Sequence, residues 1–259
     1  MVDTAPIVET HGGVKVVRED LRRFGDANGT KARALYAIAS DAKLGVVTAG
    51  GRSSTQSLMM GCVARHLNLP FAYHCPAGDS TPILEFLESI GTRIERHRPG
   101  YGGVVSARGR EDAAATGFTF IPTGVEGPRM IAVVSAAAAQ VDFTGVSRLV
   151  VPVGSGMTLC GILRHVATLR NRPDVVGVSV GASPKRRLKL YAPANWQSFV
   201  EIVSPEISFK KSGPDDFHGV PVDPHYSGKC VSFLQSGDMF WNSGARQCVH
   251  AFTCTQPKT

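Results

Sequence analysis

The sequence has no long apolar run. Its longest mostly apolar stretch, residues 130–141, is too short and too rich in alanine to span a bilayer. Residues 1–10 include Asp3 and Glu9 and no extended apolar segment, so they do not read as a secretory signal. We therefore expect a soluble, cytoplasmic protein with no membrane partner.

The sequence also lacks any CxxC pair, although it has six cysteines. A disulfide framework is not expected in a chain of 259 residues, of which 43% are hydrophobic. His250 and Cys254 are four residues apart, but no further ligands stand at a spacing that suits zinc. The cysteines are interpreted as buried or incidental thiols, and no metal site is predicted.

No helix-turn-helix, zinc-finger or aromatic RNA-binding signature is present. The formal net charge is nevertheless +7, from 28 basic and 21 acidic residues. Three interpretations stay open: a nucleic-acid partner, a solvated basic surface, or a pocket that attracts an anionic substrate and cofactor. Basic pairs and runs occur at residues 22–23, 93–98, 108–110, 185–189 and 210–211.

Short β-rich runs alternate with helical patterns along the chain, which predicts an α/β fold with mostly parallel sheets. We expect a smaller αβ domain over residues 44–122, inserted in a larger domain formed by residues 1–43 and 123–259. Residues 101–116 are rich in glycine and charge and carry only a weak pattern. The expected strands are 44–49, 71–74, 92–96, 118–122, 147–153 and 175–180, and the expected helices are 54–67, 81–90, 128–141 and 158–169.

Two local patterns carry the chemistry. Lys31 follows the turn Asn28-Gly29-Thr30, where an extended stretch gives way to a helical pattern. Gly154-Ser155-Gly156-Met157-Thr158 lies between an apolar strand and a helix, where backbone N–H groups and the helix N-terminus favour a phosphate. An amine that forms an imine and a phosphate cradle together predict a cofactor with an aldehyde and a phosphate, namely pyridoxal 5'-phosphate (PLP).

Five collinear segments resemble the 1-aminocyclopropane-1-carboxylate deaminase / D-cysteine desulfhydrase family. These enzymes use PLP and have fold type II, like the tryptophan synthase β subunit, with two three-layer αβ domains. The resemblance covers most of the chain and implies a homodimer. The first segment, residues 18–33, contains REDL (18–21), FG (24–25) and NGTKAR (28–33). The other four are TAGGRSSTQ (48–56), IPTG (121–124), GSGMT (154–158) and VDPHYSGK (222–229).

The resemblance implies a role for three side chains in catalysis. Lys31 matches the Schiff-base lysine that also moves the α-proton. Ser54 matches the serine that binds the substrate carboxylate or assists proton transfer, and Tyr226 matches a tyrosine that contacts the substrate.

Cofactor-binding roles follow from the same resemblance. The phosphate would be held by Gly154, Ser155, Gly156, Met157 and Thr158. Ser227 stands where the family places the partner of the pyridine nitrogen. A hydroxyl there leaves that nitrogen largely unprotonated, which favours β-elimination or β-replacement.

Three positions depart from the family pattern. Thr55 replaces the asparagine that bonds the cofactor's 3'-oxygen, Met157 replaces a glycine of the phosphate turn, and Ala34 stands where many relatives have a second lysine. These changes leave the usual substrate open.

The function expected from these residues is that of a PLP-dependent lyase or deaminase, which abstracts the α-proton of a small amino acid and eliminates or replaces a β-group. One alternative is a PLP enzyme that acts on an amino-acid-modified base in nucleic acid, as in hypermodified viral DNA. A second is a catalytically inactive PLP-fold binding protein.

Overall fold

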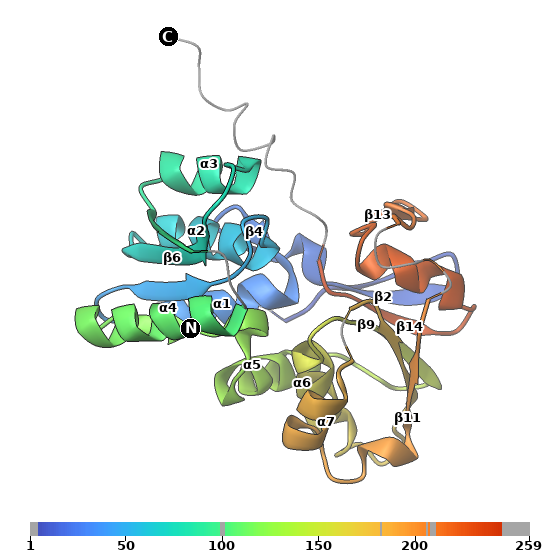
Figure 1. Ribbon diagram of the computed structural model, residues 1–259. Coiled ribbons are helices and arrows are strands. Elements are labelled where there is room, and N and C mark those ends of the chain that lie inside the picture. Colours follow the sequence, from blue (N-terminus) through green and yellow to red (C-terminus); the bar gives the residue numbers. More distant parts are fainter. Residues whose placement is uncertain (1–4, 99–101, 182, 206, 208–210, 245–259) are drawn as a thin grey trace. The chain divides into compact units, whose positions relative to one another are not determined.

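The computed structural model describes residues 5–98, 102–181, 183–205, 207 and 211–244 (Figure 1). The described chain divides into two compact units, each with its own sheet. Unit 1 takes in the residues up to 22, residues 28–30 and those from 128 onward, and unit 2 takes in residues 23–27 and 31–127. The assignment of a cofactor-binding domain to residues 1–43 and 123–259 stays a prediction.

The sheet of unit 1 has six strands in the order β1-β2-β14-β9-β10-β11. Only the β1–β2 pair is antiparallel, and every other neighbouring pair is parallel. The last five of the six residues of β9 are buried, as expected for a central parallel strand that is covered on both faces. The strands are β1 (Val8–His11), β2 (Val14–Arg18), β9 (Arg148–Val153), β10 (Asp174–Ser179), β11 (Val200–Val203) and β14 (Met239–Asn242).

Both faces of this sheet are covered. On one face Val150 and Phe240 pack in a cluster with Val220 and Cys230. On the other face, Gly177 lies close to Leu159 of α6. The covering elements are α5 (Pro128–Ala138), α6 (Met157–Val166) and α7 (Lys185–Tyr191), with the short segments η1 (Glu19–Leu21), η3 (Trp196–Ser198), η4 (Ser227–Phe233), β12 (Asp216–Phe217) and β13 (Val220–Pro221).

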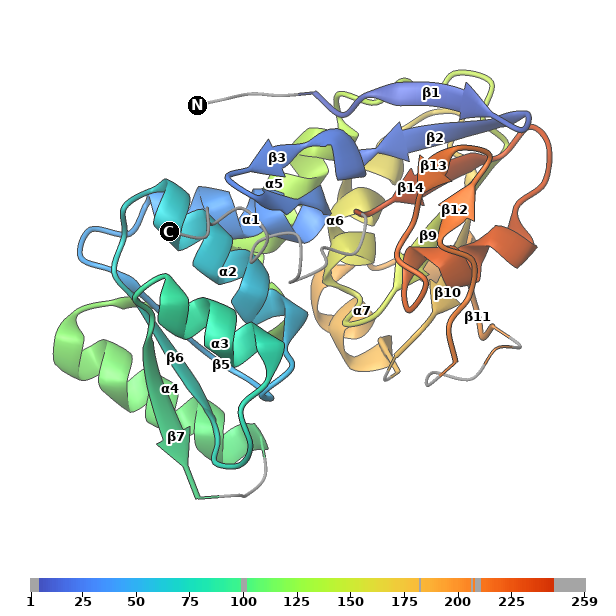
Figure 2. The same cartoon turned by 90° about the horizontal axis from the view of Figure 1, so that it is seen from above.

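Unit 2 has a four-stranded parallel sheet in the order β7-β6-β5-β8. Helices α2 and α3 lie on one face of this sheet and α4 lies on the other (Figure 2). Its elements are β3 (Arg23–Phe24), β4 (Ala27–Asn28), α1 (Gly29–Ser40), β5 (Val46–Ala49), α2 (Thr55–His66), β6 (Phe71–Pro76), α3 (Pro82–Ser89), β7 (Arg93–His97), α4 (Gly102–Thr116), β8 (Thr119–Ile121) and η2 (Thr123–Val125), with β4 and α1 each shared with unit 1.

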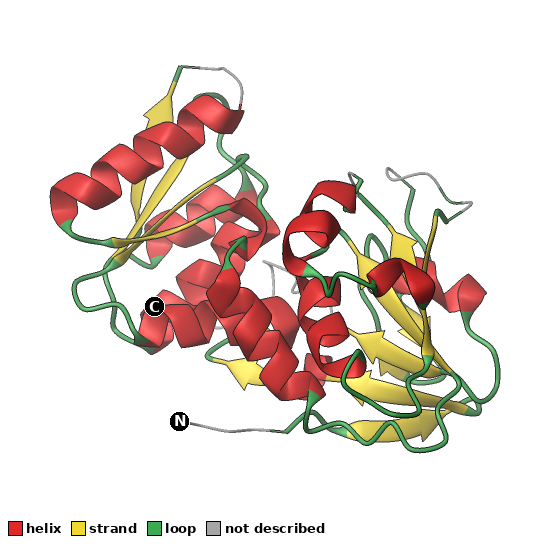
Figure 3. Ribbon diagram, turned by 90° about the horizontal axis from the view of Figure 1, so that it is seen from below, coloured by secondary structure: helices red, strands yellow, loops and turns green. Residues whose placement is uncertain are grey.

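The predicted α/β class with mostly parallel sheets is confirmed, and helices accompany the strands of each unit in Figure 3. The six expected strands and four expected helices all form. No helix in the described part of the chain is long and apolar enough to cross a membrane.

Helix α4 is the main element that the sequence pattern did not predict. Its buried residues, Val105, Gly109 and Ala113, recur every fourth position but are small, so the apolar stripe is faint. The small side chains are required by close packing, since a Cβ on Gly109 would lie 2.9 Å from the ring of Phe120.

A glycine also sets the packing of α5 on α6. A Cβ on Gly161 would lie 2.5 Å from Cβ of Val134, closer than real contacts allow. We predict that Gly161→Ala lowers the free energy of unfolding by about 1–3 kcal/mol, because the two helices must move apart. Chemical denaturation measures this change.

The matched control is Gly103→Ala in the first turn of α4, where an added Cβ would meet nothing within 4 Å. This control is expected to be neutral or stabilising, because alanine favours a helix over glycine by up to about 1 kcal/mol. Equal destabilisation by both substitutions would contradict the packing argument.

Candidate active site

The glycine turn joins strand β9 to helix α6 in unit 1. Gly156 has a left-handed backbone (φ 88°), which suits glycine, and it is the N-cap of α6. In the described part of the chain, the backbone N–H groups of Ser155, Gly156 and Thr158 have no hydrogen-bond acceptor. Ser155 and Thr158 are half-buried and add hydroxyl groups. The turn therefore presents a set of donors suited to an anion.

Met157 occupies this turn without obstructing it. Its side chain is fully buried, because residue 157 is the first of α6 and packs in the core. Its backbone N–H donates to Oγ of Ser155 over 3.5 Å. Since the backbone at residue 157 is helical, no glycine is needed at this position.

Tyr226 lies against the same turn. Its hydroxyl accepts a hydrogen bond from the N–H of Gly154 (3.1 Å) and donates one to the carbonyl of Pro152 (3.1 Å). Burial raises the pKa of this phenol above its ordinary value. The structure thus places Tyr226 at the end of β9 with its hydroxyl engaged by backbone groups.

Ser227 is the first residue of η4 and is fully buried. Its Oγ accepts from the N–H of Asp223 (2.9 Å) and donates to the carbonyl of Gly244 (3.4 Å). Both hydrogen bonds are to neutral backbone groups.

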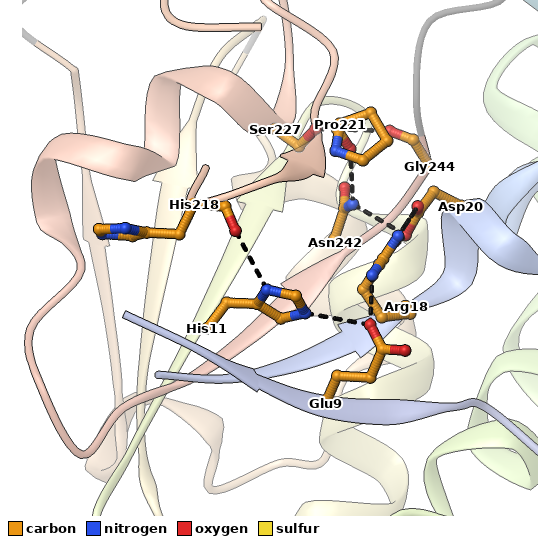
Figure 4. Close-up of polar contacts among 9 residues, drawn as sticks. All are labelled: Glu9, His11, Arg18, Asp20, His218, Pro221, Ser227, Asn242 and Gly244. Carbon is orange, nitrogen blue, oxygen red and sulfur yellow. Dashed lines mark hydrogen bonds and ion pairs between the residues drawn. The ribbon is translucent and has the colours of Figure 1, made fainter. Parts of the chain in front are cut away.

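A polar network lies beside Ser227 (Figure 4). Arg18 forms a paired hydrogen bond with the carboxylate of Asp20 (Nε–Oδ1 2.9 Å, Nη2–Oδ2 2.8 Å), and both side chains are buried. Asn242 donates to Asp20 (3.0 Å) and to the carbonyl of Pro221 (3.0 Å). The network holds the end of β14 in place. Glu9 bonds both Arg18 and His11, and His11 also bonds the carbonyl of His218.

The start of α1, just before Lys31, is held by the end of β14. Nε1 of Trp241 donates to Oγ1 of Thr30 (3.0 Å), and the N–H of Thr30 donates to the carbonyl of Ser243 (2.9 Å). Gly29 has φ 91°, and a Cβ there would lie 2.3 Å from the same carbonyl. Lys31 follows in the first turn of α1 and is half-buried.

Ser54 and Thr55 lie at the N-terminus of α2 in unit 2. Ser54 is the N-cap, and its Oγ accepts from the N–H of Ser57 (3.3 Å). Thr55 is the first residue of the helix and is exposed. A helix N-terminus with a half-buried serine suits a carboxylate ligand.

The structure therefore gathers Gly154–Thr158, Tyr226 and Ser227 in unit 1. It places Lys31, Ser54 and Thr55 in unit 2. Sequence reasoning missed Trp241 and Asn242, whose roles depend on partners more than 200 residues away in the chain.

Four cysteines in the described part of the chain, Cys62, Cys75, Cys160 and Cys230, are buried free thiols. This confirms the interpretation of these four, while Cys248 and Cys254 lie outside the described residues, as does His250. No group of metal-ligating side chains is found within the described ranges.

Residues 5–203 match the model of the family described as pyridoxal-phosphate dependent enzyme. The chain belongs to this family. It has fold type II, and its cofactor is PLP. No curated protein matches the sequence.

Solved structures agree on the fold. An ACC deaminase homologue superposes with a TM-score of 0.75 at 18% identity, over 93% of this chain and 89% of that chain. Threonine deaminase isoform 2 of Solanum lycopersicum has a TM-score of 0.65 at 14% identity, over 96% of this chain and 81% of that one. Maize serine racemase has a TM-score of 0.62 at 13% identity, over 96% of this chain and 91% of that one.

The residues of the glycine turn fit the phosphate of PLP. Three N–H groups at the start of a ten-residue helix have no acceptor among the described residues, and two hydroxyls stand beside them. The turn contains no acidic side chain that would repel a phosphate.

We predict that Tyr226→Phe lowers the free energy of unfolding by about 1–2 kcal/mol, because two hydrogen bonds to the end of β9 are lost. Tyr36→Phe, which keeps the ring contact of Tyr36 with Phe24, is the control. Thermal and urea denaturation of both variants measure the effect. A Tyr226→Phe protein as stable as the wild type would show that the phenol does not support the turn.

Proposed function

We propose that this PLP-dependent enzyme is a lyase or deaminase that removes the α-proton of a small amino acid and expels or replaces a β-substituent. The proposal includes the narrower resemblance to the 1-aminocyclopropane-1-carboxylate deaminase / D-cysteine desulfhydrase family. The structural neighbours named as an ACC deaminase homologue and a threonine deaminase support the proposed reaction class.

The observation that carries the proposal is the environment of Ser227. Ser227 is proposed as the partner of the pyridine nitrogen, and among the described residues its hydroxyl bonds to backbone groups. A neutral partner does not stabilise a protonated nitrogen, so the cofactor is a weaker electron sink. Elimination of a β-group needs less electron withdrawal than reactions that store the negative charge on the cofactor.

Lys31 is proposed as the residue that links to the cofactor and moves the α-proton. PLP supplies an aldehyde that condenses with amines and a ring that withdraws electrons from the α-carbon. The bonds of Thr30 to Trp241 and Ser243, which hold the residue before Lys31 in place, support this role. Its amine, once released by the substrate, is the base at the α-carbon.

Ser54 and Thr55 are proposed to hold the substrate and cofactor from the N-terminus of α2. The first N–H groups of this twelve-residue helix and Oγ of Ser54 suit the substrate carboxylate. Thr55 is proposed to contact the 3'-oxygen with its hydroxyl. Gly154–Thr158 hold the phosphate, and Tyr226 contacts the substrate through its ring while its hydroxyl supports the turn.

A polyanionic substrate receives less support. Arg93 pairs with Glu95 and Asp112, Arg96 pairs with Glu88, and Arg108 pairs with Glu111, so the basic runs at 93–98 and 108–110 carry matching acidic charge. We therefore favour a small amino acid over a modified base in nucleic acid. We also propose that the protein forms a homodimer and is located in the cytoplasm.

We predict that PLP-loaded wild-type protein releases a keto acid and ammonia from an amino acid with a β-leaving group, screened over D- and L-forms. Lys31→Ala should abolish turnover, because the base at the α-carbon is lost. The control is Lys43→Ala, which removes an exposed lysine of unit 2.

Inversion of the α-carbon without release of a keto acid would identify a racemase instead. Bound PLP with no turnover of any amino acid would favour a binding protein without catalytic activity. Full activity of Lys31→Ala would contradict the role proposed for Lys31.

A further inference from the structure

Helix α7 packs directly on the glycine turn of unit 1. A Cβ on Gly156 would lie 3.0 Å from Cβ of Pro184, the residue before α7. The thiol of Cys160 in α6 donates to the carbonyl of Arg187 (3.6 Å), and Leu188 is fully buried. These contacts hold the backbone of α7 beside the turn.

From this position the half-buried side chain of Arg187 reaches back to the turn. Its Nη1 donates a hydrogen bond to the carbonyl of Ser155 over 3.4 Å. The other basic residues of α7, Lys185, Arg186 and Lys189, are exposed.

This bond controls a neighbouring donor because the peptide between Ser155 and Gly156 is planar and trans. The carbonyl of Ser155 and the N–H of Gly156 point in opposite directions across that plane. When Arg187 holds the carbonyl, the N–H of Gly156 is directed away from Arg187. This N–H is one of the three in the turn that have no acceptor in the described part of the chain.

A peptide next to glycine is free to rotate, because glycine occupies left-handed and right-handed backbone regions at similar cost. In the opposite orientation the carbonyl oxygen of Ser155, not the N–H of Gly156, would face the phosphate. An arginine on the carbonyl selects the orientation that binds an anion, and its positive charge lies close to the same loop.

We propose that Arg187 is a positioning residue that holds the Ser155–Gly156 peptide in its phosphate-binding orientation. This proposal rests on the proposed placement of the PLP phosphate at the glycine turn. Within the basic run at 185–189, it gives a role to Arg187, the member that bonds the turn.

The first test compares Arg187→Gln, Arg187→Lys and the control Lys189→Gln, which removes one positive charge from an exposed site on the same helix. Binding of PLP and of pyridoxal, which lacks the phosphate, is titrated for each variant after thermal melts show that it is folded. Arg187→Gln should weaken PLP by about tenfold, as expected for the loss of one charge-assisted hydrogen bond, and leave pyridoxal unchanged. Arg187→Lys should recover part of this loss.

An equal weakening of PLP binding by Lys189→Gln and Arg187→Gln would overturn the proposal, because a general positive field would then account for the effect. An equal weakening of PLP and pyridoxal by Arg187→Gln would also overturn it.

The second test needs no cofactor. In the protein prepared without PLP, the amide signal of Gly156 in an NMR spectrum should be sharp in the wild type and broadened by exchange in Arg187→Gln. The signal of Gly145, another left-handed glycine of unit 1, should be the same in both. A sharp Gly156 signal in Arg187→Gln would overturn the positioning role. If wild-type protein failed to bind PLP, the proposed function would fail, and this second test would still decide the role of Arg187.

Discussion

Strand β14 lies between β2 and β9, and this pairing joins the two ends of unit 1. The end of β14 then holds three other segments. Trp241 bonds Thr30 at the start of α1, Asn242 bonds Asp20, and Gly244 accepts from Ser227. The buried pair of Arg18 and Asp20 completes this arrangement, and removal of one partner of such a pair costs about 3–5 kcal/mol. The residue before Lys31 and the proposed partner of the pyridine nitrogen therefore depend on one short strand.

The glycine turn shows how such a site tolerates variation. Its binding groups are backbone N–H groups, so the side chains of the turn can change where the backbone conformation allows it. Met157 is helical and directs its side chain into the core, whereas Gly156 has a left-handed backbone that a side chain would strain. Support comes from outside the turn, where Tyr226 bonds Gly154 and Arg187 bonds Ser155.

The sequence predicts the parallel α/β fold well, because buried strands such as residues 147–153 alternate with strongly periodic helices. It does not predict α4, whose buried stripe consists of small residues, or β14, a four-residue strand whose identity depends on distant partners. The turn before Lys31 and the glycine turn are local motifs and were recognisable. The engagement of the Tyr226 hydroxyl with Pro152 is not, because a long-range contact leaves no local pattern.

The central claim is that Lys31 carries the cofactor. Treatment of the PLP-loaded protein with borohydride, followed by proteolysis and mass spectrometry, locates the lysine to which the cofactor is linked. Our account predicts a single pyridoxyl modification on the peptide that contains Lys31. Modification of another lysine, such as the buried Lys229, or of none, would contradict it.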